Sequence, residues 1–429
     1  MIKKLLFIGV FCLFIVICQA KDILFIGNPD GNSDKRPLLV IEKNKPPRKI
    51  LPPKGWSLSG YDYDWKLSPD GTKLLVTYVE VTTNIHPDYY RDYCLILYDL
   101  IDTTVSRQIW ESQDDFHVEW SYDNRHILIQ TQIPNGGKKP EALFHELYCQ
   151  ERLDFDKNNP LKIYLVDIQT NKITLISPAN ENTFITYILN DVFHPENVYF
   201  FTVDFLEIPE NCRRNMAPPE IKHIYYGPKA PWPDDIGVSG NDDPYGYVIK
   251  GLYRSNILTG QITDETDLWG FMTTHFKKAF VADSCFYILQ ENNKEIPRNY
   301  GIYKRNFWIE KWEQNKSTPE MFLKWNQKSE IGLHESTNKW LVSPNGRWSG
   351  LPLGDSIYLL DHKNKSVRCI LKRTIWDMSD IHAFSGKSKH LYYWTKLRKR
   401  RDTYNYYLHK YNILLDQHKV VYKEKRITH

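Results

Sequence analysis

A short strand–turn–strand pattern recurs along this chain and limits the folds open to it. The pattern is clearest in "WKLSPDGTKLLVTY", residues 65–78, where a Pro-Asp-Gly turn separates two apolar runs. Pro69 fixes φ at the first turn position, Asp70 can bond its own backbone, and Gly71 can adopt the left-handed conformation that closes hairpins. The segment "CLILYDLIDTTVSRQIW", residues 94–110, adds a second strand pair around Asp102. Together these segments predict a four-stranded antiparallel meander.

The same pattern returns along the rest of the chain. A serine before a polar turn and a β-rich strand recurs in "VEWSYDNRHILIQTQ" from Val118 and in "WLVSPNGRWSGLPL" from Trp340. Weaker copies cover residues 189–265, 276–312 and 380–424. The six meanders begin about 40 to 90 residues apart, and the shortest spacing matches the period of propeller blades.

These repeats predict an all-β fold, a six- or seven-bladed β-propeller of four-stranded antiparallel blades. An ordinary β-sandwich or a pair of sandwich domains is the alternative, since both are also rich in short strands. Before the first meander, "DILFIG", "LLVIEKN" and "RKILPP" look like two or three further strands. We expect them to complete a seventh blade with the C-terminal end, which would leave no sheet edge exposed.

The N-terminus has the features of a secretory signal peptide. Lys3 and Lys4 precede an apolar run from Leu5 to Ile17 that is too short to span a bilayer, and small residues follow. We therefore expect residues 1–20 to be removed and residues 21–429 to form a single propeller domain. The mature protein is expected to be periplasmic or extracellular, without stable membrane insertion.

Two insertions interrupt the repeats, at about residues 134–160 and 205–246. Leucines at near-helical spacing in residues 140–155 predict a short helix on the rim. The longer, proline-rich insertion is expected to be an irregular but structured loop, because Trp232 and several tyrosines would be costly to expose.

Charge and cysteine content identify no partner or redox centre. Without Lys3 and Lys4 the basic and acidic residues nearly balance, so the whole chain has no field to attract nucleic acid or an acidic membrane. The five cysteines after residue 20 contain no CxxC pair and allow at most two disulfides.

The first repeat resembles a known group of proteins. "WKLSPDGTKLLVTY" followed by "YRDYCLILYDL" resembles the blade consensus of TolB-like and WD40-like (PD40) propellers, and is similar to the N-terminal propeller of dipeptidyl peptidase IV type peptidases. The resemblance is strong over residues 61–112, moderate over 114–133 and 340–369, and specific for the fold rather than for function.

The resemblance does not extend to peptidase chemistry. Those peptidases carry a C-terminal hydrolase domain, which we do not expect in this chain. The segment "GWSLSG", residues 55–60, lacks the second glycine of a nucleophile elbow and precedes a strand. The paired glutamates that hold a substrate amino terminus in those propellers also have no counterpart.

Three histidine-containing groups are candidate metal sites, but each has an incomplete set of ligands. His117 and His126 flank a turn and should lie at opposite ends of a hairpin; His145 lacks a second histidine; His86, Asp88 and Asp92 match no calcium loop. We therefore expect no metal and no cofactor.

The densest basic run is "KLRKRRD", residues 396–402. It is expected to be a solvated hairpin loop, and the alternative is a site that binds an anionic lipid, a polyanionic glycan or an acidic protein. Nucleic acid is not an expected partner of an exported chain.

The sequence favours an exported, non-catalytic scaffold that binds a protein or peptide partner through its rim loops, as a monomer or weakly associated. The expected contact residues are Arg213, Arg214 and Trp232 in the longer insertion, residue types favoured in binding hot spots. The alternative is an enzyme acting on a sugar or peptide in the central channel. Its candidate residues lie near the starts of blades: Asp62, Asp64, His117, Glu119, Asp191, His194, Asp380 and His382.

Overall fold

The computed structural model describes most of the repeats but not the intervening segments. The described residues are 23–26, 38–42, 48–58, 65–80, 92–101, 105–113, 116–137, 161–177, 184–207, 245–269, 278–292, 303–329, 340–353, 356–372, 378–400 and 403–427. The expected signal peptide, the expected helix at 140–155 and most of the longer insertion lie outside them. Among the described residues, no helix is long and apolar enough to cross a membrane.

The described strands form six antiparallel blades and one smaller sheet. Blade 1 contains β4 (Trp56–Leu58), β5 (Trp65–Leu67), β6 (Lys73–Glu80), β7 (Tyr93–Asp99) and β8 (Ser106–Ser112). Because β4 and β5 pair with successive parts of β6, together they occupy the place of one strand. Blade 2 contains β9 (His117–Trp120), β10 (His126–Thr131), β11 (Lys162–Asp167) and β12 (Ile173–Leu175). Blade 3 contains β13 (Phe184–Asn190), β14 (Asn197–Glu207), β15 (Tyr245–Asn256) and β16 (Ile262–Asp264), followed by the 3-10 turn η4 (Thr266–Leu268).

The second half of the chain repeats this order. Blade 4 contains β17 (Lys278–Ala282), β18 (Cys285–Asn292), β19 (Tyr303–Trp312) and β20 (Glu320–Ser329). Blade 5 contains β21 (Leu341–Val342), β22 (Trp348–Leu353), β23 (Ser356–Asp361) and β24 (Ser366–Lys372). Blade 6 contains β25 (Met378–Phe384), β26 (His390–Arg400), β27 (Thr403–Asn412) and β28 (Gln417–Ile427).

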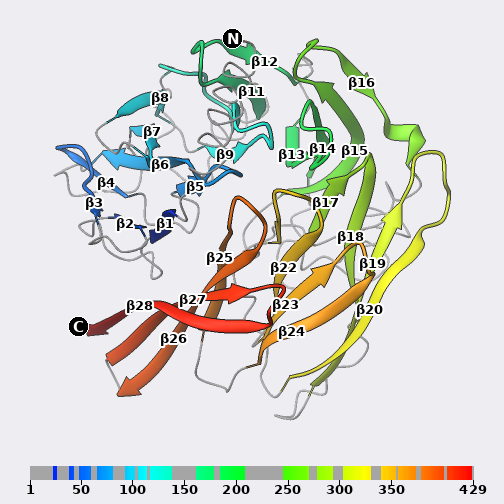
Figure 1. Cartoon of the computed structure of the whole chain (residues 1–429). Helices are drawn as coiled ribbons and strands as arrows, with labels where there is room; N and C mark the ends of the chain where they lie inside the picture. The colour runs from blue at the N-terminus through cyan, green and yellow to red at the C-terminus, as the bar shows by residue number, and fades with distance from the viewer. Residues whose placement is uncertain are drawn as a thin grey trace, which may run out of the picture.

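The blades follow one another around a common centre (Figure 1). First strands of neighbouring blades contact each other, as β5 does with β9, β13 with β17 and β21 with β25. First strands therefore lie innermost and fourth strands outermost. This arrangement is an all-β, six-bladed propeller of four-stranded sheets, which confirms the predicted fold class.

Apolar residues alternate along each strand and fill the spaces between blades. In β6, Leu74, Val76 and Tyr78 face one side, whereas Leu75 faces the other and packs against Ile127 and Ile129 of blade 2. This two-residue alternation is the property of a strand that is covered on both faces. Equivalent clusters join blade 2 to 3, 3 to 4, 4 to 5 and 5 to 6.

The N-terminal strands form a separate three-stranded sheet: β1 (Ile23–Ile26), β2 (Leu38–Glu42) and β3 (Arg48–Ile50). Leu38, Val40 and Ile50 are buried against the face of blade 1 that points away from blade 2. The expectation that the C-terminal end completes this sheet is wrong, because β28 pairs with β27 as the fourth strand of blade 6.

The basic run at 396–402 is also not the expected loop. Residues 396–400 belong to β26, and β27 begins at Thr403, so a short connection remains. The register places Arg398, Tyr404 and Arg426 side by side across β26, β27 and β28. Because β27 pairs on both edges, the three strands extend together to the end of blade 6 at which β26 connects to β27.

Candidate functional site

The turn between the first and second strand of blade 1 is held by its own side chains. Ser68 Oγ donates to Asp70 Oδ1 at 2.7 Å and accepts from the backbone N–H of Lys73 at 2.9 Å. Asp70 Oδ1 also accepts the backbone N–H of Thr72 at 2.9 Å. Gly71 has φ +74°, a conformation that favours glycine. The Ser-Pro-Asp-Gly motif is therefore a structural turn.

Other blades repeat this turn. In blade 5, Ser343 Oγ donates to Asn345 Oδ1 at 2.8 Å and accepts from the N–H of Trp348 at 3.0 Å. Ser121 in blade 2 and Ser385 in blade 6 start equivalent turns, each closed by a backbone bond back to the serine. The predicted repeat is thus confirmed in its chemistry as well as in its spacing.

The turns contact one another around the axis. The backbone N–H of Asp70 donates to Asn124 Oδ1 at 2.8 Å, joining blades 1 and 2, and Ser121 Oγ donates to the Pro195 carbonyl at 3.1 Å, joining blades 2 and 3. The N–H of Asn345 donates to Ser388 Oγ at 3.1 Å between blades 5 and 6.

Blade 6 meets blade 1 at the same end. A Cβ added to Gly386 would lie 2.5 Å from the carbonyl oxygen of Asp70. The ring of six blades therefore closes at these two turns.

Asp191 joins blades 3 and 4 in this ring. Its buried carboxylate accepts four backbone N–H groups: those of Phe193 and His194 in its own turn, and those of Asp283 and Ser284 in blade 4. His194 Nε2 lies 3.6 Å from Asp283 Oδ1. A carboxylate with four backbone donors has a structural role, since its lone pairs are already used.

A polar cluster lies on the innermost strands of blades 1 and 2. Lys66 Nζ of β5 donates to Glu119 Oε1 of β9 at 2.7 Å, and His117 Nε2 lies 3.1 Å from the same oxygen. The indole N–H of Trp120 donates to the Lys66 carbonyl at 3.0 Å, which fixes the two strands side by side. The Glu119 side chain keeps 31% of its surface exposed, so the cluster is reachable from solvent.

The charge of Glu119 is strongly stabilised. Burial is the largest single influence and opposes ionisation, but Lys66 and His117 together lower the pKa of Glu119 to about 2. Burial, and then the nearby carboxylates Glu119 and Asp191, raises the pKa of the Tyr122 hydroxyl. Glu119 is consequently a weak base near neutral pH, far from the range that suits a general base.

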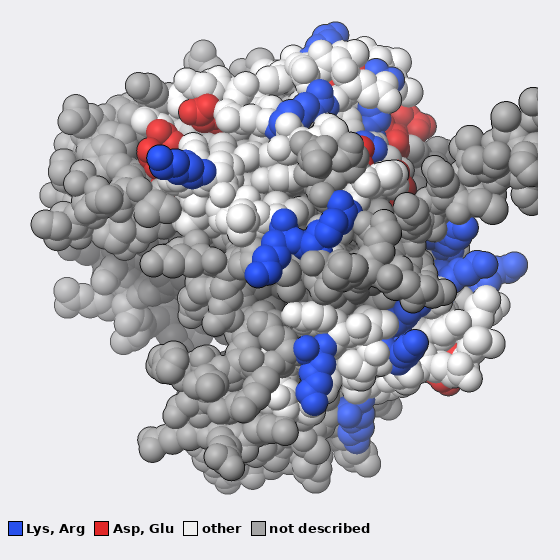
Figure 2. Space-filling model, turned by 60° about the vertical axis from the view of Figure 1, so that its left-hand side comes forward, with Lys and Arg blue, Asp and Glu red and all other residues white. Residues whose placement is uncertain are grey.

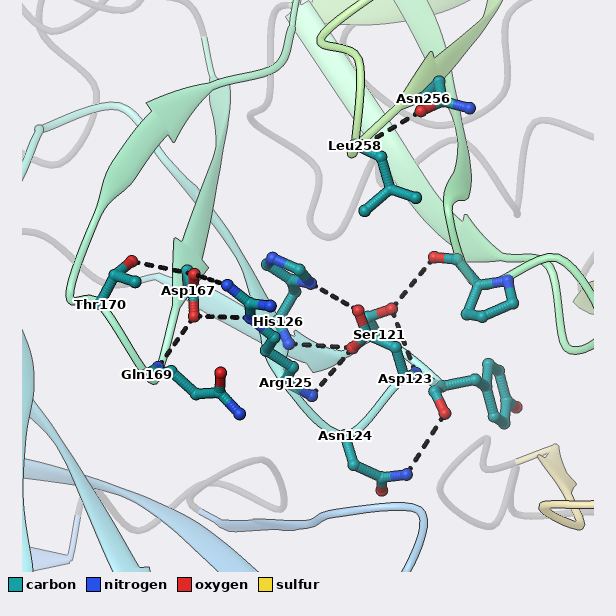
Figure 3. A network of polar contacts seen from close by, with 12 residues as sticks. Ser121, Asp123, Asn124, Arg125, His126, Asp167, Gln169, Thr170, Asn256 and Leu258 are labelled. Atoms are coloured by element: carbon teal, nitrogen blue, oxygen red, sulfur yellow. Dashed lines mark hydrogen bonds and ion pairs between the residues drawn. The ribbon is translucent and has the colours of Figure 1, made fainter.

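A polar network fixes the turn that joins β9 and β10 in blade 2 (Figure 3). Arg125 makes a two-pronged contact with Asp167, Nε to Oδ1 at 3.0 Å and Nη2 to Oδ2 at 2.5 Å. The hydrogen bond from Arg125 is the main cause that lowers the pKa of Asp167. Arg347 and Asp361 repeat this pair in blade 5. The recurrence shows that these charges belong to the repeat rather than to a reactive site.

An aromatic cluster lies between blades 4 and 5. The His362 ring lies 5.0 Å from Phe280, 5.9 Å from Tyr287 and 5.7 Å from Phe322, measured between ring centroids. Its Nε2 bonds Ser349 Oγ at 2.9 Å, whereas its buried Nδ1 has no partner in the described part of the chain. Burial lowers the pKa of His362 to about 4.

The structure brings together some of the residues named from the sequence. His117 and Glu119 share one cluster, whereas Asp191 and His194 lie in the turn ring. His126 begins β10, at the opposite end of the hairpin from His117 as predicted. Asp380 and His382 lie on β25, and the structure describes their backbone but not their side chains. Five further residues lie outside the described residues altogether: Asp62, Asp64, Arg213, Arg214 and Trp232.

Lys66 is not among the candidate residues that the sequence indicates. A usable signal existed, because Lys66 and Glu119 each stand two residues before the turn serine of adjacent repeats. Among the described residues there is no group of three or more His, Cys, Asp or Glu arranged to hold a metal ion.

Comparison with known proteins identifies no family for this chain. No protein-family model matches the sequence, and no curated protein is significantly similar to it. Solved structures similar to this chain include TolB from Acinetobacter baumannii, with TM-score 0.37 and 13% identity over 83% of this chain and 66% of TolB. An oligogalacturonate lyase from Vibrio parahaemolyticus has TM-score 0.38 and 13% identity over 87% of this chain and 93% of the lyase.

Dipeptidyl peptidase 4 from Porphyromonas gingivalis is also similar, with TM-score 0.39 and 9% identity over 94% of this chain and 59% of the peptidase. The chain therefore spans less than two thirds of TolB and of the peptidase. At these identities and TM-scores the similarity assigns neither a family nor a function to this chain.

Proposed function

We propose that this protein is an exported, non-catalytic propeller scaffold that binds a protein or peptide partner through its rim loops. The proposed contact residues are Arg213, Arg214 and Trp232 in the insertion between β14 and β15. The signal-peptide pattern in residues 1–20 supports export, and a rigid ring of blades suits the display of loops.

One observation carries the non-catalytic part of the proposal. Two described carboxylates on the inner strands and their turns are engaged in building the ring: Asp191 accepts four backbone N–H groups, and Glu119 contacts Lys66 and His117. A catalytic carboxylate would instead keep a lone pair, or a proton with a suitable pKa, directed at a substrate.

The enzyme alternative depends on the cluster of Lys66, His117 and Glu119, which is exposed enough to be reached from solvent. An ammonium, an imidazole and a carboxylate side by side could position an anionic substrate. The ionisation of Glu119 and the absence of a second free carboxylate among the described residues beside it make hydrolysis the less supported function.

Capture of the partner tests the scaffold role. The mature chain, immobilised, should retain a specific partner from the envelope fraction of cells that make it. A variant carrying Arg213→Ala, Arg214→Ala and Trp232→Ala should lose that partner at unchanged melting temperature.

A variant carrying Lys54→Ala and Lys172→Ala, two exposed lysines on other parts of the chain, is the control and should retain the partner. Undiminished capture by the triple variant would remove the insertion from the proposal. Turnover of sugar or peptide substrates that disappears in Glu119→Gln would favour the enzyme instead.

A further inference from the structure

Charge is distributed very unevenly along this chain. Residues 340–429 contain 18 Lys and Arg against 7 Asp and Glu, leaving 38 Lys and Arg against 45 Asp and Glu in residues 1–339. The near-neutral total therefore hides a basic part, blades 5 and 6, attached to an acidic remainder. Such asymmetry between parts of one chain indicates a localised electrostatic interaction.

Basic residues of blade 6 lie on β26, which contains four, and on the outermost strand β28, which also contains four. Lys419 and Lys423 of β28 are exposed, and within the described part of the chain neither forms an ion pair with a carboxylate. Lys425 and Arg426 follow in the same strand, which has Glu424 as its acidic residue. Figure 2 shows Lys and Arg side chains in blue over the lower part of the molecule, where blade 6 lies.

Neighbouring contacts hold these positive charges in place. Lys423 Nζ lies over the Tyr407 ring at 5.4 Å, and Lys410 Nζ lies over the Tyr392 ring at 5.7 Å. Lys410 and Lys419 are direct partners across β27 and β28. Like charges opposite each other in a sheet are destabilising, so the fold tolerates a cost to keep this region positive.

The same strand has an open edge. Among the described strands β28 pairs with β27 alone, and its 11 residues make it the longest outer strand of the six blades, whereas β12 and β16 have 3 each. An edge strand presents unpaired backbone N–H and C=O groups that can pair with another chain. Lysines on an edge discourage pairing with a second, equally basic copy, and they leave an acidic strand as the complementary occupant.

We propose that the edge of β28 binds an extended acidic peptide segment of a partner protein as an added strand. The backbone of the segment would pair with β28, and its acidic side chains would meet Lys419 and Lys423. The bulge at Val421 places Lys419, opposite Lys410, and Lys423, opposite Tyr407, on opposite faces of the sheet. The segment that pairs with β28 should therefore carry acidic side chains on both faces. This inference rests on the proposed scaffold role and adds to it a second surface and a partner chemistry.

The probe is a synthetic peptide of about nine residues in which Glu-Glu and Thr-Thr pairs alternate, so that each face of the added strand carries Glu. It should bind the full mature chain, and amide hydrogen exchange should slow within residues 417–427. The variant Lys419→Glu/Lys423→Glu should weaken binding at least about tenfold, because two attractions become repulsions. The same variant should gain affinity for the peptide in which Lys replaces Glu.

Two controls separate strand addition from simple charge attraction. The variant Lys54→Glu/Lys172→Glu carries the same change in net charge at exposed positions elsewhere and should bind the Glu-Thr peptide as the parent does. The Glu-Thr peptide methylated on every backbone nitrogen keeps its charge but loses the N–H donors of both edges, so it cannot pair as a strand and should not bind.

Equal binding of the methylated peptide would overturn the proposal and indicate a general polyanion site. Tight binding to vesicles of anionic lipid, with no exchange protection of β28 by the peptide, would overturn it in favour of a membrane surface. The Arg213, Arg214 and Trp232 variant could lose peptide binding while the β28 variant keeps it. That result would reject this surface and leave the proposed function intact.

Discussion

The burial of His362 makes the stability of the fold depend on pH. Its ring is enclosed by Phe280, Tyr287 and Phe322, and Asp361 is its nearest acidic neighbour in sequence. Burial lowers its pKa to about 4, from about 6.5 in an unfolded chain, so the folded state holds the neutral form.

The fold should therefore lose stability as the pH falls from about 6.5 to about 4. Over that range His362 binds a proton in the unfolded chain but stays neutral in the folded chain. Above about pH 6.5 the effect is absent, and below about 4 it is complete, at up to about 3 kcal/mol. Urea denaturation at a series of pH values measures it. His362→Gln, which can still bond Ser349, should reduce the slope in this range by about one proton, and an unaltered slope would contradict the account.

Two glycines at equivalent turn positions differ in their surroundings. Gly71 has φ +74° and open space within 4 Å of an added Cβ, whereas at Gly346, φ +66°, the Cβ would lie 2.4 Å from Phe193 Cζ. A side chain at either position would carry the backbone penalty of a left-handed conformation. At Gly346 it would also meet the ring of Phe193, which belongs to blade 3.

Gly71→Ala should cost about 1 kcal/mol of unfolding free energy, from backbone strain. Gly346→Ala should cost more, because Phe193 must also move. The difference should vanish when both glycine variants are compared in a Phe193→Ala background. Equal costs in the parent chain would show that Phe193 does not pack on this turn.

At the scale of elements, the N-terminal sheet is part of the structure rather than an appendage. Leu38, Val40 and Ile50 are 1%, 0% and 5% exposed against blade 1. Their burial gives the sheet a definite role even though β28 does not extend it.

Leu38→Ala should lower the unfolding free energy by roughly 2 to 5 kcal/mol, the cost of removing a buried leucine side chain. Deletion of residues 21–52 should lower the melting temperature further. Leu51→Ala, at a 66% exposed position beside β3, is the matched control and should have little effect. An unchanged melting temperature after the deletion would show that the sheet does not support blade 1.

Strands with a turn motif could be predicted from sequence, and strands without one could not. Ser68, Ser121, Ser343 and Ser385 each start a turn that the repeat predicts. β20 (Glu320–Ser329) was not among the predicted segments, because no such turn introduces it. Residues 396–400 were expected in a loop on the basis of charge, but pairing with β27 outweighs the preference of charged side chains for loops.

At the scale of the whole molecule, ring closure decides which polar groups meet. Lys66 and Glu119 are 53 residues apart and belong to separate blades, so their contact is signalled by their equal position in adjacent repeats and not by any pattern within one repeat. The sequence indicates Glu119 and His117 as inner residues, and the arrangement of the blades shows that Lys66 contacts Glu119. The four donors of Asp191 come from two blades and were beyond sequence reasoning.

The central claim is that the inner polar groups stabilise the ring while a loop surface binds the partner. Glu119→Gln is expected to reduce stability by about 1 to 3 kcal/mol at pH 7, since the ionised form is stabilised at any pH above about 4.5 and loses that advantage as the pH falls to about 2. The Arg213→Ala/Arg214→Ala/Trp232→Ala variant should keep its stability.

The most direct measurement is therefore partner capture and melting temperature on these two variants side by side. The account predicts that Glu119→Gln melts lower and still captures the partner, whereas the triple variant melts normally and captures none. Loss of function in Glu119→Gln at unchanged stability, with normal capture by the triple variant, would contradict it and place the function at the axis of the propeller.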